Sequence, residues 1–104
     1  SYYAAKAGVD ALTRYMAGVG GEDNIRVNCV RPGQILTPGA TGGTTSDADG
    51  GHHVFEKMFD YFQIVKGPGY PIDVANLVLF LSSDESRFIN GEMINVDGGV
   101  AAKI

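Results

Sequence analysis

Tyr2 and Lys6 are two residues whose types and spacing suit proton transfer. They are four positions apart, which places both side chains on one face of a helix. A lysine ammonium beside a tyrosine phenol stabilises the phenolate, so such a phenol can take a proton from an alcohol or give one to a carbonyl. The spacing alone is common by chance, and a half-buried tyrosine beside an exposed lysine produces it equally well. The weight of this pair therefore depends on the rest of the sequence.

Two other features could carry chemistry. Asp47, Asp49 and the pair His52-His53 could suggest a metal site, but the order D-A-D-G-G-H-H matches neither an EF-hand loop nor a zinc-ligand pattern. Solvated residues at a helix start are the stronger interpretation, and we predict no metal. Cys29 is the single cysteine and is predicted to be a small core residue. With no internal disulfide to form, a cytoplasmic location is predicted.

A helix and a strand are predicted to position these residues. Residues 2–19 carry apolar side chains at helical spacing among several alanines, and Gly20-Gly21 is expected to stop the helix. Residues 25–31 (IRVNCVR) have the alternation of a strand. Pro32-Gly33 should end that strand, because proline has no amide hydrogen to continue a ladder.

The middle of the chain is predicted to contain a long loop and a helix. Residues 33–51 are rich in Gly, Thr and Pro, and a loop of about 19 residues is long for a compact domain unless it is functional or disordered. Regular elements on both sides favour a lid over an interdomain tether. Residues 52–66 return to a helical pattern with an apolar stripe over residues 54–65, and Gly67-Pro68-Gly69 should terminate it.

The last third is predicted to be a helix followed by a strand. Pro71 should begin a helix that runs to about Ser83, with Asp73 complementing the helix dipole. This helix has so little polar face that most of it is expected to be buried. Residues 92–97 (EMINVD) read as a strand that ends in Gly98-Gly99. A strand, a helical crossover and another strand predict a parallel pairing in an α/β fold.

The composition excludes some classes of function. With 44% hydrophobic and 19% charged residues, the chain should be a soluble globular protein. A net charge of −4 argues against nucleic-acid binding and against docking on an anionic membrane. No apolar run approaches the roughly 20 residues that span a bilayer. The chain has no initiator Met and no signal-peptide pattern at its start, so we expect that it was processed or cut from something longer.

Three blocks of sequence carry a resemblance to a known family. In order, they are Y-Y-A-A-K-A-G-V, R-V-N-C-V-R-P-G-Q-I-L-T and F-I-N-G-E-M-I-N-V-D-G-G. Together they resemble the C-terminal half of the short-chain dehydrogenase/reductase family. The resemblance implies that residues 1–104 form the last two strands and flanking helices of a doubly wound parallel sheet of Rossmann type. It also implies that residues 33–66 are the substrate-binding loop and lid helix of that single domain.

The resemblance implies a role for each candidate residue. Tyr2 is the expected catalytic acid/base, and Lys6 is expected to assist it and to hydrogen-bond the nicotinamide ribose. Pro32-Gly33 is expected to begin the segment under the nicotinamide, where the main chain of Ile35 contacts the carboxamide and Thr37 places its hydroxyl near the carboxamide or pyrophosphate. The implied cofactor is NAD or NADP. The residue that distinguishes them, the Gly-rich motif and the catalytic Ser and Asn are all expected upstream, so Ser1 is not the catalytic serine.

Two functions therefore remain open. The first is an oxidoreductase that interconverts an alcohol and a ketone, with this chain as a portion that is inactive alone. The second is a non-catalytic fragment or truncated paralogue that acts in fold completion or subunit association. The expected partners are a small-molecule alcohol or ketone, the missing N-terminal half of the fold, and further copies in a dimer or tetramer. The apolar stripe over residues 54–65 hints at a hydrophobic or cyclic substrate.

Overall fold

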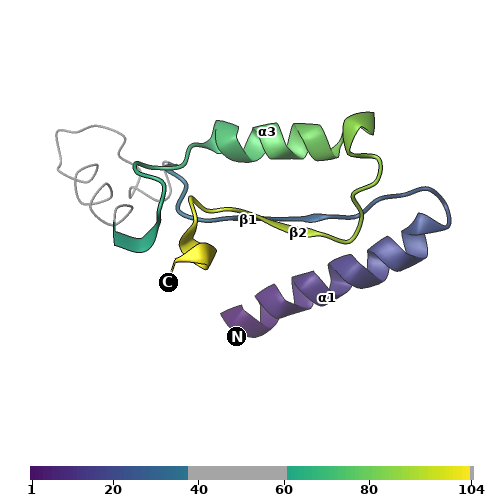
Figure 1. Cartoon of the computed structure of the whole chain (residues 1–104). Helices are drawn as coiled ribbons and strands as arrows, with labels where there is room; N and C mark the ends of the chain where they lie inside the picture. The colour runs from purple at the N-terminus through teal and green to yellow at the C-terminus, as the bar shows by residue number, and fades with distance from the viewer. Residues whose placement is uncertain (38–60, 104) are drawn as a thin grey trace. The chain divides into compact units, whose positions relative to one another are not determined.

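The computed structural model describes residues 1–37 and 61–103 of the chain (Figure 1). The elements, in order, are helix α1 (Tyr2–Gly21), strand β1 (Cys29–Pro32), helix α3 (Pro71–Leu81), a 3₁₀ turn (Asp84–Ser86), strand β2 (Met93–Val96) and a second 3₁₀ turn (Val100–Ala102). This order confirms the predicted α/β class. Most of the predicted loop and lid helix, with Asp47, Asp49 and His52-His53, lies outside the described residues.

Strands β1 and β2 pair in a two-stranded sheet (Figure 1). The amide of Cys29 donates to the carbonyl of Glu92 at 2.7 Å, and the amide of Gly33 donates to the carbonyl of Val96 at 2.9 Å. Both partners advance in the same direction along their strands, so the pairing is parallel. Helix α3 lies between the two strands in the sequence, which confirms the predicted strand–helix–strand unit.

The first strand is shorter than predicted, because it begins at Cys29 and residues 25–28 do not belong to it. The amide of Val27 donates to the side-chain oxygen of Asn90 at 2.9 Å, and its carbonyl accepts from the amide of Gly91 at 2.8 Å. A side chain and a turn thus provide the partners that a strand ladder would have supplied. The prediction of the second strand is confirmed, with bounds one residue inside those expected.

Two helix ends differ from their predictions. Helix α1 continues through Gly20-Gly21 and has its C-cap at Glu22. A Cβ atom on Gly20 would lie 3.2 Å from the side chain and carbonyl of Ile25, so this glycine gives room to the turn that follows. The helix predicted to reach Lys66 ends at Phe62. The amides of the next residues do not continue the helical hydrogen bonds, because those of Ile64 and Val65 both donate to the carbonyl of Gly98.

Arg26 explains where α3 ends. Its Nη2 donates to the carbonyls of Leu81 at 2.9 Å and Ser83 at 3.1 Å, which are carbonyls at and just past the helix end. Its Nη1 donates to the hydroxyl of Ser86 at 3.0 Å and to the carbonyl of Ile89 at 3.3 Å. The Ser86 side chain is almost fully buried. One guanidinium therefore fixes the whole connection between α3 and β2.

The prediction that α3 is mostly buried is wrong, because none of its residues is buried in this chain. Among the described residues, Ala17 is the one buried hydrophobic residue. Helices normally cover both faces of a parallel sheet, and two strands offer too little surface for that arrangement. Both helices consequently expose large apolar side chains, among them Val9, Leu12, Val19, Val78 and Leu79.

The chain divides into two compact units. The first comprises Ser1–Arg31 and Asn76–Ile94, and the second comprises Pro32–Ala75 and Asn95–Ile104. The candidate residues fall into two groups, one in each unit, and each group is described within its own unit below. Within the described part of the chain, no helix has the length and apolarity needed to cross a membrane.

Candidate active site

Tyr2 and Lys6 meet on the first two turns of α1, as their spacing predicts. The Ser1 hydroxyl accepts a hydrogen bond from the amide of Ala4 at 3.3 Å, so Ser1 is the N-cap and the helix begins at Tyr2. The ammonium of Lys6 lies 5.4 Å from the centroid of the Tyr2 ring.

Water surrounds this pair in the described chain. The Tyr2 residue is 69% exposed, and its ring packs edge-on against Tyr3 with 5.6 Å between ring centroids. Lys6 is also exposed. Attraction between exposed charged and polar groups is weakened by water and salt. Helix α1 therefore sets the geometry of the pair, while these residues alone give it little shielding from solvent.

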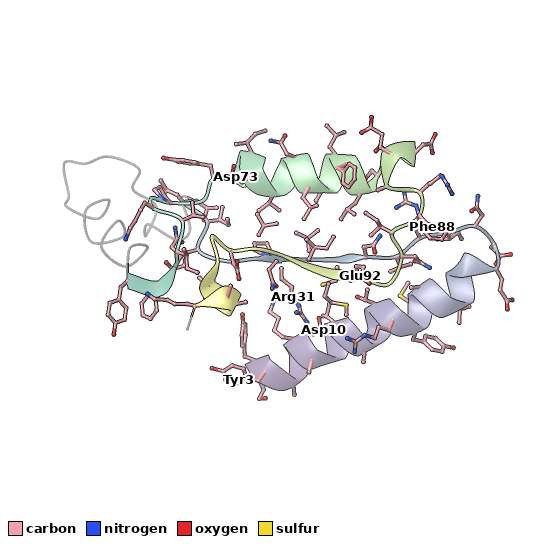
Figure 2. The ribbon with its side chains drawn as sticks, in the orientation of Figure 1. Tyr3, Asp10, Arg31, Asp73, Phe88 and Glu92 are labelled. Atoms are coloured by element: carbon pink, nitrogen blue, oxygen red, sulfur yellow. The ribbon has the colours of Figure 1, made fainter. Side chains whose placement is uncertain are left out.

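Two contacts fix α1 against the neighbouring elements of its unit. Arg31 on β1 forms an ion pair with Asp10 on α1, and Figure 2 shows the two side chains directed toward each other. Near the other end of α1, the side-chain amide of Asn90 donates to the carbonyl of Ala17 at 3.1 Å. A Cβ atom on Gly91 would lie 3.4 Å from the Ala17 side chain, so the helix passes close to this turn. These contacts position the helix that carries Tyr2.

The second group of candidates follows β1. Pro32 is the last residue of the strand, and Gly33 continues the pairing through its bond to Val96. A Cβ atom on Gly33 would lie 2.7 Å from both the Cα and the Cβ of Asp97, a distance that real Cβ atoms essentially never reach. Only glycine fits there. Thr37 is half-buried and interacts with another group, so it is not a free side chain.

The N–H and C=O of Ile35 bond to no other backbone group among the described residues. Ile35 forms a parallel bridge with Gly69, in which the amide of Leu36 donates to the Gly69 carbonyl at 2.8 Å. In a parallel bridge of this register, the backbone hydrogen bonds to Gly69 come from the residues before and after Ile35. The N–H and C=O of Ile35 itself therefore point away from Gly69. A carboxamide needs one donor and one acceptor, and this residue offers both. The expected nicotinamide contact at Ile35 stays a prediction.

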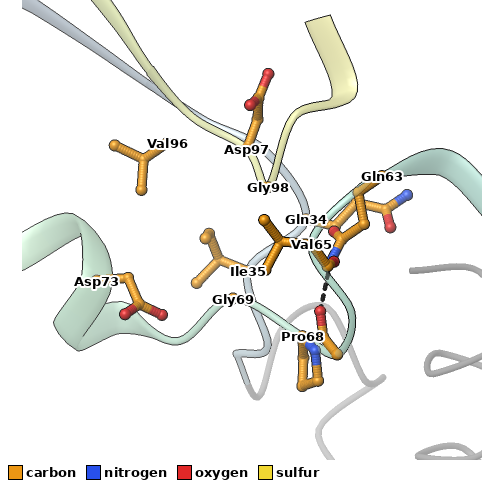
Figure 3. Close-up of a pocket in the computed structure, with 11 residues that line it drawn as sticks. Gln34, Ile35, Gln63, Val65, Pro68, Gly69, Asp73, Val96, Asp97 and Gly98 are labelled. Atoms are coloured by element: carbon orange, nitrogen blue, oxygen red, sulfur yellow. Dashed lines mark hydrogen bonds between the residues drawn. The ribbon is translucent and has the colours of Figure 1, made fainter. Parts of the chain in front are cut away.

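A pocket of about 210 Å³ lies beside this segment, entirely within the second unit. Figure 3 shows Ile35 near its middle, with Val96 and Asp97 toward one side and Pro68 toward another. The Gln34 side-chain oxygen, which has no hydrogen-bond partner, is buried next to it. Small-molecule sites usually enclose about 300–1,000 Å³. The pocket is thus too small for a whole cofactor or substrate and can hold only part of one.

The turn after β2 closes one side of the pocket. The two carboxylate oxygens of Asp97 accept from the amides of Gly99 at 2.9 Å and Ala101 at 3.1 Å. Gly98 and Gly99 have φ angles of 61° and 91°, which favour glycine. The sequence predicted that the strand ends in Gly98-Gly99, and these bonds and φ angles describe the turn that follows it.

Gln63 was not predicted to matter. It is 4% exposed and lines the pocket, and its side-chain amide donates to the carbonyls of Val65 and Gly67. The one available signal was a polar residue among the apolar residues Phe62, Ile64 and Val65. In the described ranges, no group of three His, Cys, Asp or Glu side chains could hold a metal ion.

The chain is similar to known proteins over most of its length. Residues 1–101 match the family described as enoyl-(acyl carrier protein) reductase. The chain is 41% identical over 99 residues to a 7alpha-hydroxysteroid dehydrogenase of Bacteroides fragilis, covering 95% of this chain and 36% of that protein.

Two solved structures are similar over nearly the whole chain. A 4-hydroxyisoleucine dehydrogenase complexed with NADH and succinate superposes with a TM-score of 0.79 at 33% identity, covering 98% of this chain and 38% of that one. A putative 2-deoxy-D-gluconate 3-dehydrogenase from Agrobacterium tumefaciens with bound NADP superposes with a TM-score of 0.76 at 30% identity. This match covers 99% of this chain and 39% of that one. The chain thus spans less than two fifths of the length of each of these relatives.

Proposed function

The chain belongs to the short-chain dehydrogenase/reductase family and forms part of a Rossmann-type α/β fold, and from that premise we propose that it carries the proton-transfer half of an NAD(P)-dependent active site. The reaction is the interconversion of an alcohol and a ketone. When bound, the nicotinamide supplies or accepts the hydride. The observation that carries the proposal is the position of the Lys6 ammonium over the Tyr2 ring on the first two turns of α1.

Tyr2 and Lys6 have separate tasks in this proposal. The Tyr2 hydroxyl takes the proton from the substrate oxygen during oxidation and returns it during reduction. The Lys6 ammonium stabilises the phenolate and donates a hydrogen bond to the nicotinamide ribose. Lys6 forms no salt bridge among the described residues, so its donors are available for that contact.

The segment after β1 holds the nicotinamide end of the cofactor. Pro32-Gly33 begins the segment, and the main chain of Ile35 offers its donor and acceptor to the carboxamide. The Thr37 hydroxyl lies near the carboxamide or the pyrophosphate. Residues 33–66 are assigned to substrate binding in this proposal. The proposal leaves both NAD and NADP open as the cofactor.

The test is hydride transfer by the complete protein that contains this chain. Purified protein is given cofactor labelled with deuterium at the reactive carbon and a panel of secondary alcohols and ketones, and the label is followed into the product by mass spectrometry. Cofactor binding is measured separately by fluorescence titration. Binding of NAD(P) with transfer of the label to a ketone supports the proposal. Failure to bind either cofactor would contradict it.

The proposed assembly includes residues beyond this chain. The exposed apolar positions of α1 and α3 suit burial against the N-terminal part of the fold and against further copies in a dimer or tetramer. A cytoplasmic location is also proposed, because the single cysteine can form no internal disulfide.

A second candidate is a non-catalytic fragment that acts in fold completion or subunit association. The observation in its favour is the scarcity of buried residues, because a chain with one buried hydrophobic residue in its described part lacks a core of its own. Intact mass and N-terminal sequencing of the natural protein separate the two. A longer polypeptide, or an associated N-terminal piece, supports the enzyme. A natural product of 104 residues that associates with folded copies and binds no cofactor supports the second candidate.

A further inference from the structure

We propose that Gln63 is a positioning residue that fixes the main chain of Ile35 for the cofactor, an inference that rests on the proposed function. Gln63 is 96% buried, although glutamine is mostly found on protein surfaces. Both hydrogens of its side-chain amide are used, one for the carbonyl of Val65 and one for that of Gly67. It therefore closes the turn that leads to Gly69 from the inside.

The C-terminal turn holds Gln63 from the opposite side. A Cβ atom on Gly98 would lie 3.2 Å from the terminal carbon and nitrogen of the Gln63 side chain, so the two residues are already in close contact. The carbonyl of Gly98 also accepts from the amides of Ile64 and Val65, at 2.9 and 2.8 Å. Gln63 is thus anchored to the end of β2 and is not free to move with the turn.

The same turn determines the position of Ile35. Gly69 comes two residues after Gly67 and bridges Ile35, with the Leu36 amide bonded to its carbonyl. A Cβ atom on Gly69 would lie 2.8 Å from the end of the Ile35 side chain, so the approach is close. Contacts therefore run without interruption from Gly98 through Gln63 and the turn to Ile35. Any displacement of the turn moves the donor and acceptor offered to the carboxamide.

An apolar side chain of the same size cannot replace Gln63 in this role. Methionine has a similar length but no donors, so the carbonyls of Val65 and Gly67 would lose their partners inside the turn. Buried carbonyls without partners are unfavourable, and the turn is expected to open toward water. The bridge at Ile35 should open with it.

The first test uses amide hydrogen exchange on the complete protein without cofactor. In Gln63→Met, the Leu36 amide should exchange at least tenfold faster than in the unmodified protein, because its bond to Gly69 is loosened. The Gly33 amide, which is bonded to Val96, should be unchanged and shows that the sheet remains folded. Gly98→Ala places a methyl group against the Gln63 side chain and also strains a residue with a φ of 61°, so it should speed exchange at Leu36 but does not by itself assign the effect to Gln63. Unchanged exchange at Leu36 in both variants would overturn the proposal.

Lys66→Ala is the matched control, because Lys66 lies in the same turn with an exposed side chain. It should leave exchange at Leu36 within about twofold of the unmodified protein. An effect equal to that of Gln63→Met would show that the turn is merely fragile, and the specific role of the Gln63 amide would be rejected.

The second test separates positioning from a general loss of folded protein. Gln63→Met should raise the KM for the cofactor about tenfold and leave kcat within about twofold, whereas partial unfolding lowers the apparent kcat and leaves KM unchanged. Faster exchange at Leu36 with an unchanged cofactor KM would overturn the link to the cofactor. If the unmodified protein binds no NAD(P), the proposed function fails, and exchange at Leu36 still decides whether Gln63 positions this segment.

Discussion

The Lys6 ammonium lies 5.4 Å from the centre of the Tyr2 ring. Tyr3 is the next residue of α1, and successive residues of a helix point about 100° apart around its axis. Lys6 is three residues from Tyr3 and four from Tyr2, so both tyrosines are its neighbours on the helix surface, but the Lys6 ammonium lies over the Tyr2 ring. This difference between otherwise similar side chains provides an internal control for the catalytic assignment.

Tyr2→Phe should lower kcat by about 10²- to 10⁴-fold, the usual contribution of a general acid or base. The substitution removes the hydroxyl and keeps the ring, so the Kd for the cofactor should change by less than about threefold. Steady-state kinetics and fluorescence titration on the complete protein measure the two quantities.

Tyr3→Phe is the control for this prediction, because it removes a hydroxyl from the adjacent position, which is 83% exposed. Its kcat should stay within about twofold of the unmodified value. Activity of Tyr2→Phe above a few per cent, or an equal loss in Tyr3→Phe, would contradict the role given to Tyr2.

Lys6→Met should impair both catalysis and cofactor binding, because Lys6 is given a task in each. The loss of an ammonium that stabilises a phenolate and bonds a ribose is expected to lower kcat by at least tenfold and to weaken cofactor binding by about tenfold. Lys6→Arg keeps the charge but not the compact shape, so partial recovery of binding is expected. If Lys6→Met altered kcat alone, the ribose contact would have to be abandoned.

Arg26→Met should destabilise the complete protein by about 2–4 kcal/mol, because Leu81, Ser83 and Ile89 lose a charged donor in a partly buried site. Arg31→Met is the matched control. Arg31 forms an ion pair with Asp10 in which the two side chains are 42% and 25% exposed, so its removal should cost below about 1 kcal/mol. Denaturant unfolding of both variants checks the difference, and equal effects would count against the role of Arg26.

Gly33→Ala should destabilise the complete protein by about 1–3 kcal/mol, because the new methyl group overlaps the backbone of Asp97. Gly18→Ala in α1 meets nothing within 4 Å among the described residues of this chain and removes a flexible residue from a helix, so it should stabilise by about 0.5–1 kcal/mol. Thermal unfolding compares the two. Tolerance of Gly33→Ala would show that β1 and the turn at Asp97 are further apart than described.

The sequence was sufficient for the elements that local pattern determines. The strand–helix–strand order, the second strand and the meeting of Tyr2 with Lys6 follow from periodicity and from the positions of proline and glycine. The burial of α3 could not be predicted correctly from its apolar composition. That composition indicates which side chains favour burial, but it does not show whether another surface is present to cover them. The late start of the first strand also depended on Asn90, whose side chain bonds Val27 from more than 60 residues away in the chain.

The roles of Arg26 and Gln63 could not be predicted from the sequence pattern. Each acts through its side chain on carbonyls that only tertiary folding brings within range, and neither spacing nor composition encodes those partners. The expectation for Ile35 came from resemblance and stays a prediction, although the register of its bridge to Gly69 directs its N–H and C=O away from Gly69. Thr37 remains a prediction.

The close contact between Gly33 and Asp97 makes two distant positions interdependent. Asp97 commits both carboxylate oxygens to the turn that follows it, so its backbone cannot retreat to make room for a side chain at position 33. In a chimaera built from two relatives, a crossover between these positions would join a strand end to a turn that was not shaped for it. In such a chimaera, position 33 and residues 97–101 should therefore come from the same parent protein.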